Sequence, residues 1–231
     1  MDIFIDIETL PTSNAYEIGK ITQEICDDVN RKIEELPGKY AKDETIAKHA
    51  LALEQGKYEK IKEVLNGTAL DGAFGELLAI GVAFDDCPGV VLYRMPKESE
   101  TSLLMKLDAL IPFETESAMH WIGHNVLWDM RFLWHRSIAN KVTMSRIDPD
   151  FIQYTDTMLK WAGRGNRISL DKLCRALSIE SPKGDMDGSK VLEAYRDERH
   201  DEIKKYCLAD VEAARQIYRR MAPALVPLSR G

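Results

Sequence analysis

Two acidic residues, Asp6 and Glu8, stand two positions apart near the start of the chain. Around them Ile3, Ile5 and Ile7 alternate with other side chains, and alternation with period 2 predicts a β-strand. Successive strand residues point to opposite faces, so the two carboxylates share one face. Carboxylates this close repel each other and lose hydration unless both face water at an exposed strand end. The pair therefore indicates either a cation site or a solvated strand end.

A second chemically informative pair, Tyr206 and Asp210, lies near the end of the chain. Apolar residues at helical spacing predict a helix over about 201–221, and Asp210 falls on its apolar stripe. A buried carboxylate is costly alone, so Asp210 requires an arginine, capping contacts or a metal. Tyr206 lies one turn earlier, which places its phenol beside the Asp210 carboxylate.

A fourth acid, Asp129, falls in the first turn of a helix that we expect Asn125 to cap. An acid at this position can simply complement the helix dipole. It can also join the other acids, because this helix follows a strand of the same sheet. The cleft at the carboxyl ends of sheet strands is the usual place for a site in an α/β protein.

The elements that must position these residues can be read from hydrophobic periodicity and turn residues. After the first strand we expect a helix from about residue 18 to Leu36, ended by Pro37-Gly38, and helices over about 43–55 and 58–65. We expect strands over about 76–84, 90–94 and 118–122 and one ending near 155, with helices over about 101–110, 126–138 and 201–221 and helices starting at about 156, 169 and 189. This order predicts an α/β fold with a mixed sheet flanked by helices. We interpret residues 1–231 as a single domain with a helical insertion at about 14–70.

Composition restricts the class of protein. The net charge of −7 argues against a protein that coats nucleic acid through a general basic surface. The four cysteines are scattered, which is typical of a reducing compartment rather than of a disulfide framework. No apolar run approaches the roughly 18 residues of a membrane span, and the first strand leaves no room for a signal peptide. We therefore expect a cytoplasmic protein with no membrane partner.

Three segments together resemble the exonuclease motifs of the DEDD superfamily. They are the stretch from Phe4 to Leu10, the stretch from Ile122 to Asp129 that reads IGHNVLWD, and Tyr206-Cys-Leu-Ala-Asp210. The tyrosine four residues before the last aspartate resembles the motif of the DEDDy branch of this superfamily, which has a tyrosine at that position. Residues 68–76 and 183–189 resemble a narrower group of stand-alone exonucleases, common in phages and prophages, that are related to the exonuclease domain of family B DNA polymerases. The resemblance implies a ribonuclease H-like five-stranded mixed sheet with a helical insertion.

The resemblance also implies a mechanism. Asp6, Glu8, Asp129 and Asp210 would bind two divalent cations, Mg²⁺ with Mn²⁺ as substitute, which accept hard oxygen ligands. Tyr206 would orient the attacking water, because a phenol with a pKa of about 10 is a poor base at neutral pH. The catalytic set is then Asp6, Glu8, Asp129, Tyr206 and Asp210.

Substrate contacts follow from the same resemblance. Thr9 and Leu10 match positions that touch the terminal nucleotide, and Asn125 matches a residue that contacts the substrate backbone, although it can serve only as the helix cap. The expected activity is 3′-5′ removal of nucleotides from single-stranded or frayed DNA 3′ ends. A 3′-5′ exoribonuclease and a non-catalytic module that binds nucleic acid or a protein remain alternatives. We hypothesise that the helical insertion clamps the strand or docks a replication or recombination protein.

Overall fold

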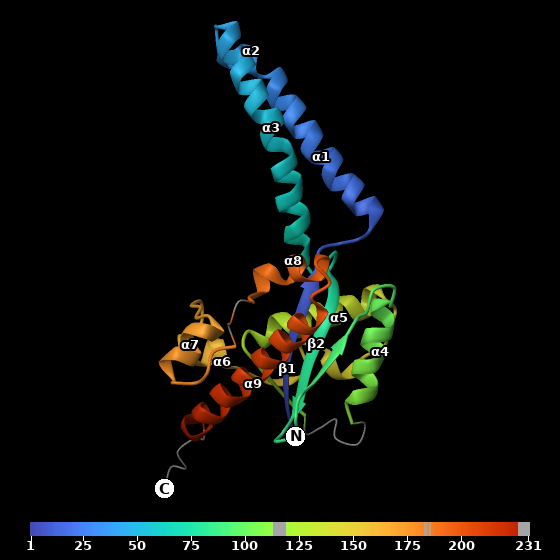
Figure 1. Cartoon of the computed structure of the whole chain (residues 1–231), viewed down its shortest axis with the longest axis vertical. Helices are drawn as coiled ribbons and strands as arrows, with labels where there is room; N and C mark the ends of the chain where they lie inside the picture. The colour runs from blue at the N-terminus through green and yellow to red at the C-terminus, as the bar shows by residue number, and fades with distance from the viewer. Residues whose placement is uncertain (113–118, 183, 185, 226–231) are drawn as a thin grey trace. The chain divides into compact units, whose positions relative to one another are not determined.

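The computed structural model of the chain describes residues 1–112, 119–182, 184 and 186–225 (Figure 1). It divides into two compact units, which are described separately: Met1–Thr9 with Leu77–Gly231, here called the sheet unit, and Leu10–Glu76, here called the helical unit. Part of the expected strand at 118–122 and positions 183 and 185 of the 183–189 segment lie outside the described residues. The expectation of a single domain stays a prediction.

The sheet unit is built on five strands. They are β1 (Asp2–Leu10), β2 (Glu76–Phe84), β3 (Val90–Tyr93), β4 (His120–Gly123) and β5 (Gln153–Asp156). The strand order is β3-β2-β1-β4-β5, with β1 parallel to β4, β4 parallel to β5, and β2 antiparallel to β3. The sheet is therefore mixed, as expected, and β1 is central. Because β1, β4 and β5 run in the same direction, their carboxyl ends meet at one edge.

The helices of the sheet unit are α4 (Glu100–Leu110), α5 (Val126–Ala139), α6 (Thr157–Ala162), α7 (Leu170–Ala176), α8 (Val191–Arg196) and α9 (His200–Leu225), with short 3₁₀ turns at Ser145–Ile147 and Gly188–Lys190. Figure 1 shows α9 crossing the sheet. The α/β fold with a five-stranded mixed sheet and flanking helices confirms the predicted fold class.

The alternation of β1 explains why both faces of the sheet are covered. Ile3, Ile5 and Ile7 pack in one cluster with apolar residues of α4 and α5, among them Leu104 and Met130. Phe4 points the other way and packs with a smaller cluster that includes Ala83, Ile122 and Val211 of α9. Each buried aliphatic or aromatic side chain contributes about 1.5–3 kcal/mol relative to an exposed one, so β1 is stabilised from both sides.

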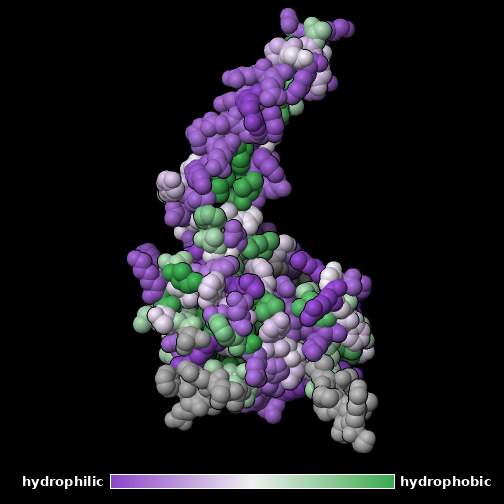
Figure 2. Space-filling view, turned by 180° about the vertical axis from the view of Figure 1, so that it is seen from behind, coloured by the Kyte–Doolittle hydropathy of each residue, from purple (hydrophilic) through white to green (hydrophobic). Residues whose placement is uncertain are grey.

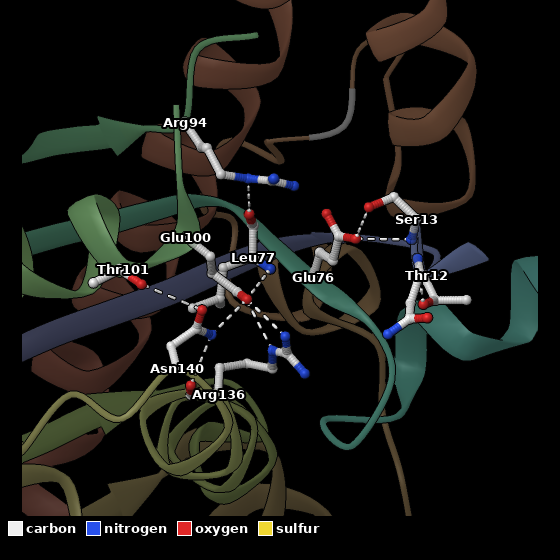
Figure 3. Close-up of polar contacts among 10 residues, drawn as sticks. Thr12, Ser13, Glu76, Leu77, Arg94, Glu100, Thr101, Arg136 and Asn140 are labelled. Carbon is white, nitrogen blue, oxygen red and sulfur yellow. Dashed lines mark hydrogen bonds and ion pairs between the residues drawn. The ribbon is translucent and has the colours of Figure 1, made fainter. Parts of the chain in front are cut away.

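A buried ionic group ties α4, α5 and β2 together (Figure 3). Glu100, 7% exposed, accepts hydrogen bonds from the backbone N–H of Leu77 at 2.8 Å and from Arg136 Nε at 2.9 Å. Its other oxygen accepts from Arg136 Nη2 and Asn140 Nδ2, both at 2.7 Å. Arg94 Nε also donates to the carbonyl of Leu77 at 2.7 Å. These contacts hold the start of β2 and the C-terminal part of α5 in fixed positions relative to each other.

The helical unit contains α1 (Ala15–Glu34), α2 (Leu36–Lys39), α3 (Asp43–Gly67) and a 3₁₀ turn at Thr68–Leu70, and α1 packs against α3. Asn14 caps α1, because its side chain accepts from the N–H groups of Tyr16 and Glu17. Within this unit Ser13 donates its N–H to Glu76 Oε1 at 2.7 Å, and Thr12 donates its N–H to Thr68 Oγ1 at 2.9 Å (Figure 3). These bonds connect the two ends of the segment.

Two helix boundaries in this unit differ from the prediction. The helices expected over about 43–55 and 58–65 are one continuous helix, α3. Gly56 does not end it, because a mid-helix glycine costs only about 1 kcal/mol relative to alanine and leaves the hydrogen-bond ladder intact. Pro37 lies in the first turn of α2, where the backbone N–H that proline lacks would have no partner within the helix. A further short helix therefore follows where the chain was expected to turn.

Candidate active site

Asp6 and Glu8 lie on the same side of β1, as the alternation of the strand predicts. Asp6 is partly exposed, whereas the Glu8 side chain is 7% exposed. Among the described residues, no hydrogen-bond donor and no cationic side chain contacts the Glu8 carboxylate. A buried carboxylate without such a partner is costly, so the site has a place for a positive charge that the described part of the chain does not supply.

Asp129 reaches the same strand from α5. Its side chain is 4% exposed, and its Oδ1 accepts a hydrogen bond of 3.2 Å from the backbone N–H of Ile7. Ile7 is the residue between Asp6 and Glu8, so this bond fixes the third carboxylate beside the first two. Asp129 is therefore more than an acid that complements the helix dipole.

The turn that leads into α5 differs from the prediction that Asn125 caps this helix through its side chain. Asn125 occupies the N-cap position, but it has φ 75° and ψ 31° in the left-handed region, and its side chain makes no capping bond. Its backbone N–H donates instead to Asp156 Oδ1 at 3.0 Å. The left-handed region is accessible to asparagine at lower cost than to most residues, which explains the residue type at this turn.

Asp210 and Tyr206 reach the site from α9. Asp210 is 8% exposed and lies on the side of α9 that faces the sheet, and the Tyr206 side chain is hydrogen-bonded to it. α9 can approach β2 closely because residue 81 is a glycine. A Cβ there would lie 2.8 Å from Val211 Cγ2 and 3.0 Å from Cys207 Sγ. Tyr206 also lines a surface cavity of about 670 Å³ between α9 and residues 180–182, 184 and 186.

The electrostatics show that the acids interact strongly. Although Asp6 is only partly covered from solvent, the surrounding protein desolvates its carboxyl group, and this, followed by the charges of Asp210, Asp129 and Glu8, raises the pKa of Asp6 well above its ordinary 3.8. Burial and the charges of Asp210 and Asp129 likewise raise the pKa of Glu8. Burial also raises the pKa of Asp129. The negative charges of Asp156 and Asp210 raise this pKa further, whereas hydrogen bonds from backbone N–H groups lower it. The site therefore favours either protons or a bound cation.

The Tyr206 phenol stays protonated in this environment. Burial is the largest cause that raises its pKa, and the negative charges of Asp210, Glu8 and Asp6 add to it. A protonated phenol can donate one hydrogen bond and accept others, so Tyr206 can position a water molecule but is a poor base.

The donor set fits a divalent cation that prefers oxygen ligands. Carboxylate oxygens of Asp6 and Glu8 and the sulfur of Cys207 lie within 4.8 Å of one another. Asp129 and Asp210 interact electrostatically with the same two acids. Mg²⁺ and Mn²⁺ are hard cations that carboxylates bind readily. The four acids thus provide the ligand types that such a site requires.

Two residues beside the site were not assigned to it from the sequence. Cys207 is fully buried on α9, and its thiol donates to the Asp6 carbonyl at 3.7 Å. Its position next to Tyr206, three residues before Asp210, was the only signal in the sequence. Asp156 caps α6 by accepting from the N–H groups of Met158 and Leu159, but its bond to Asn125 carries no sequence signal.

The expected substrate contacts lie near the end of β1 and at the start of α5. Thr9 is the last residue of the first segment of the sheet unit, and Leu10, 5% exposed, begins the helical unit. Asn125 stands at the turn described above. The structure brings Asp6, Glu8, Asp129, Tyr206 and Asp210 together, while the roles of Thr9, Leu10 and Asn125 stay predictions.

A mixed five-stranded sheet with helices on its faces and acids gathered beside its central strand is consistent with a ribonuclease H-like exonuclease fold. Residues 112–226 match the model of a family described as predicted 3′-5′ exonuclease related to the exonuclease domain of PolB. The match includes Asn125, Asp129, Tyr206 and Asp210 but not the β1 acids. A comparison with curated proteins finds no match. None of the described helices has the length and apolar character needed to cross a membrane.

Proposed function

We propose that this protein is a metal-dependent 3′-5′ exodeoxyribonuclease that releases nucleotides from single-stranded or frayed DNA 3′ ends. The observation that carries the proposal is the buried Glu8 carboxylate. It lies beside Asp6, Asp129 and Asp210, and among the described residues no cationic side chain contacts the Glu8 carboxylate. The match of residues 112–226 to a family of predicted 3′-5′ exonucleases supports the reaction class.

The proposed cofactor is a pair of divalent cations, Mg²⁺ with Mn²⁺ as substitute, held by Asp6, Glu8, Asp129 and Asp210. Two such ions, when bound, activate a water and stabilise the leaving 3′ oxygen in phosphodiester hydrolysis. Asp6 interacts electrostatically with all three other acids, which supports a site that the four residues would form together.

Tyr206 contributes to the proposed reaction through its hydroxyl group. The Tyr206 hydroxyl donates a hydrogen bond to the Asp210 carboxylate, and the raised pKa keeps the proton on the phenol at neutral pH. Tyr206 can therefore hold the attacking water in line with the phosphorus atom without removing its proton. Correct orientation of the water relative to the phosphate contributes to catalysis because it removes the entropy of finding that geometry.

The substrate positions are proposed from the resemblance of this sequence to the exonuclease motifs. Thr9 and Leu10 follow the two β1 acids, and we assign them to the terminal nucleotide, with Leu10 packing on its base. Asn125 is assigned to the substrate backbone. Its side chain makes no capping bond, which leaves the amide group available for such a contact.

We further propose that the helical unit docks a protein of replication or recombination rather than clamping DNA. Residues 10–76 contain 13 acidic and 9 basic side chains, and an excess of acids disfavours contact with the phosphate backbone. Figure 2 shows hydrophilic side chains over most of the visible face of this unit, with hydrophobic ones among them. A variant with a shortened α1–α3 hairpin should degrade a very short oligonucleotide normally but lose partner binding, whereas a loss of activity on long substrates alone would favour the clamp. Equal losses on both substrates would contradict this.

The direct test is digestion of 5′-labelled single-stranded DNA and of the matching RNA with Mg²⁺, with Mn²⁺ and with EDTA. The proposal predicts a shortening DNA ladder that EDTA and Asp6→Ala both abolish. Asp201→Ala is the matched control, because Asp201 is an exposed acid on the same helix as Asp210. Shortening of RNA alone would assign an exoribonuclease. No shortening of either by folded protein would reject self-sufficient catalysis.

A further inference from the structure

Asp156 makes more contacts than a helix cap requires. It is the last residue of β5 and is 2% exposed. Its Oδ1 accepts from the N–H groups of Met158 and Leu159, at 3.0 and 3.2 Å, which caps α6. The same oxygen accepts from the N–H of Asn125 at 3.0 Å, across 31 positions of sequence. The third bond contributes nothing to α6.

The bond to Asn125 stabilises a turn that has an intrinsic cost. Asn125 is in the left-handed region, which is disfavoured by about 1 kcal/mol or more for residues other than glycine and persists where the surroundings hold it. The preceding turn also has little freedom, because a Cβ at Gly123 would lie 2.8 Å from the carbonyl oxygen of Ile5. Asp156 therefore fixes the direction in which the chain leaves β4 and enters α5.

That direction determines where Asp129 stands. Asp129 lies four residues after Asn125, in the first turn of α5, and its Oδ1 accepts from the N–H of Ile7 in β1. An unbroken series of bonds thus runs from the end of β5 to the strand that carries Asp6 and Glu8. Hydrogen bonds in the shell around metal ligands hold those ligands in place and commonly affect metal affinity 10- to 100-fold.

We propose that Asp156 is a positioning residue of the active site, which holds Asn125 in its left-handed conformation and thereby places the Asp129 carboxylate for metal binding. This inference rests on the proposed function, because it assigns Asp129 to a divalent cation. Asp156 itself would not touch the cation, in contrast to Asp6, Glu8, Asp129 and Asp210.

The second oxygen of Asp156 makes a clean variant possible. Oδ2 is buried and has no hydrogen-bond partner among the described residues. In Asp156→Asn the amide oxygen can take the place of Oδ1 and accept the same three bonds, while the NH₂ group replaces an oxygen that accepts none. Asp156→Ala removes the acceptor. Asp156→Asn removes the charge but keeps the accepting oxygen, whereas Asp156→Ala removes both. The two variants therefore distinguish the effect of the hydrogen bonds from the effect of the charge.

The experiment measures Mn²⁺ binding to the full chain by electron paramagnetic resonance, without substrate. Asp156→Ala should weaken Mn²⁺ binding by about 10-fold or more, and Asp156→Asn should recover most of that loss. Ser169→Ala is the matched control. It removes the side-chain cap of α7, which accepts from Lys172 N–H, and should lower Tm without changing Mn²⁺ affinity. Wild-type affinity in Asp156→Ala, or an equal loss in Asp156→Asn, would overturn the inference.

A second pair of variants covers the case in which Asp156→Ala does not fold. Asn125→Gly retains the N–H group and adopts a positive φ without strain, so Mn²⁺ affinity should be unchanged. Asn125→Val retains the N–H group but opposes that conformation and should weaken binding by about 10-fold. Equal affinities in the two variants would contradict the role of the turn. If wild-type protein itself binds no Mn²⁺, the proposed function fails instead, which is a separate result.

Discussion

The Oδ1 atom of Asp129 accepts a hydrogen bond of 3.2 Å from the backbone N–H of Ile7, the residue between Asp6 and Glu8. This contact joins the first turn of α5 to the centre of β1. It holds three carboxylates in mutual repulsion, although each would be better solvated apart. The fold therefore maintains an arrangement that is unfavourable without a cation, and this cost can be measured.

The first prediction concerns the stability of the metal-free protein. Asp129→Asn can keep the bond from Ile7, because the amide oxygen also accepts, but it removes one buried negative charge. We expect the variant to be more stable at pH 7.5 by about 1 kcal/mol or more, which raises Tm by roughly 2–4 °C for a chain of this size. Thermal unfolding in EDTA measures this. A less stable variant would show that a cationic group or a further donor compensates the charge of Asp129.

The second prediction follows from the sign of the same pKa shifts. Asp6, Glu8 and Asp129 have raised pKa values in the folded state, so the folded state binds more protons than the unfolded state. The free energy of unfolding in EDTA should fall as the pH rises from the ordinary carboxyl pKa values near 4 through the raised ones. Mg²⁺ should therefore stabilise the protein more at pH 8 than at pH 5. Equal Mg²⁺ effects at both pH values would contradict this linkage.

The third prediction concerns the hydroxyl group of Tyr206. Tyr206→Phe keeps the ring and removes the group that orients the water, so kcat should fall by about 100-fold, the lower end of the usual range for a group that acts on the reacting water. Mn²⁺ affinity should be unchanged. The pKa of the phenol is raised, so the wild-type rate should show no ionisation of Tyr206 below pH 10. A basic limb that disappears in Tyr206→Phe would instead assign it the role of base.

Local sequence patterns were sufficient to predict the parts of the site that lie on regular elements. The period of β1 placed Asp6 and Glu8 on one face, and the apolar stripe of α9 placed Asp210 toward the sheet. Both depend on periodicities of 2 and 3.6 residues that a single sequence displays. The same reasoning predicted the class of fold.

The parts that were missed depend on long-range contacts or on small energies. Asn125 was expected to cap α5 with its side chain, because asparagine commonly does so, but the bond from its N–H to Asp156 favours a left-handed conformation. No local pattern connects residues 31 positions apart. Separate helices were expected over about 43–55 and 58–65, yet the cost of about 1 kcal/mol for Gly56 is smaller than the gain from a continuous helix packed on α1.

The fourth prediction concerns the buried ionic group at Glu100. Glu100→Ala leaves Arg136, whose side chain is 11% exposed, without its carboxylate partner, and removes the acceptor of the Leu77 N–H. Breaking a buried ion pair by removing one partner costs about 3–5 kcal/mol, so unfolding in urea should shift strongly. Asp201→Ala, which breaks an exposed pair with Lys204, should change stability by less than about 1 kcal/mol. Similar losses would show that the Glu100 group is solvated.

The last prediction tests the close approach of α9 to the sheet. In Gly81→Ala the new Cβ would lie 2.8 Å from Val211 Cγ2, 3.0 Å from Cys207 Sγ and 3.2 Å from the Cys207 carbonyl oxygen. The helix must move outward, so we expect a loss of about 1–3 kcal/mol of stability. Weaker Mn²⁺ binding should accompany it, because Asp210 moves with the helix.

Gly19→Ala is the matched control for this substitution. A Cβ at position 19 of α1 would meet no atom within 4 Å, and alanine favours a helix by up to about 1 kcal/mol over glycine. This variant should be as stable as wild type or more stable, with unchanged Mn²⁺ affinity. If Gly81→Ala lost stability but kept full Mn²⁺ affinity, α9 would not need to approach β2 this closely for Asp210 to reach the other acids. That outcome would leave Gly81 a role in packing alone.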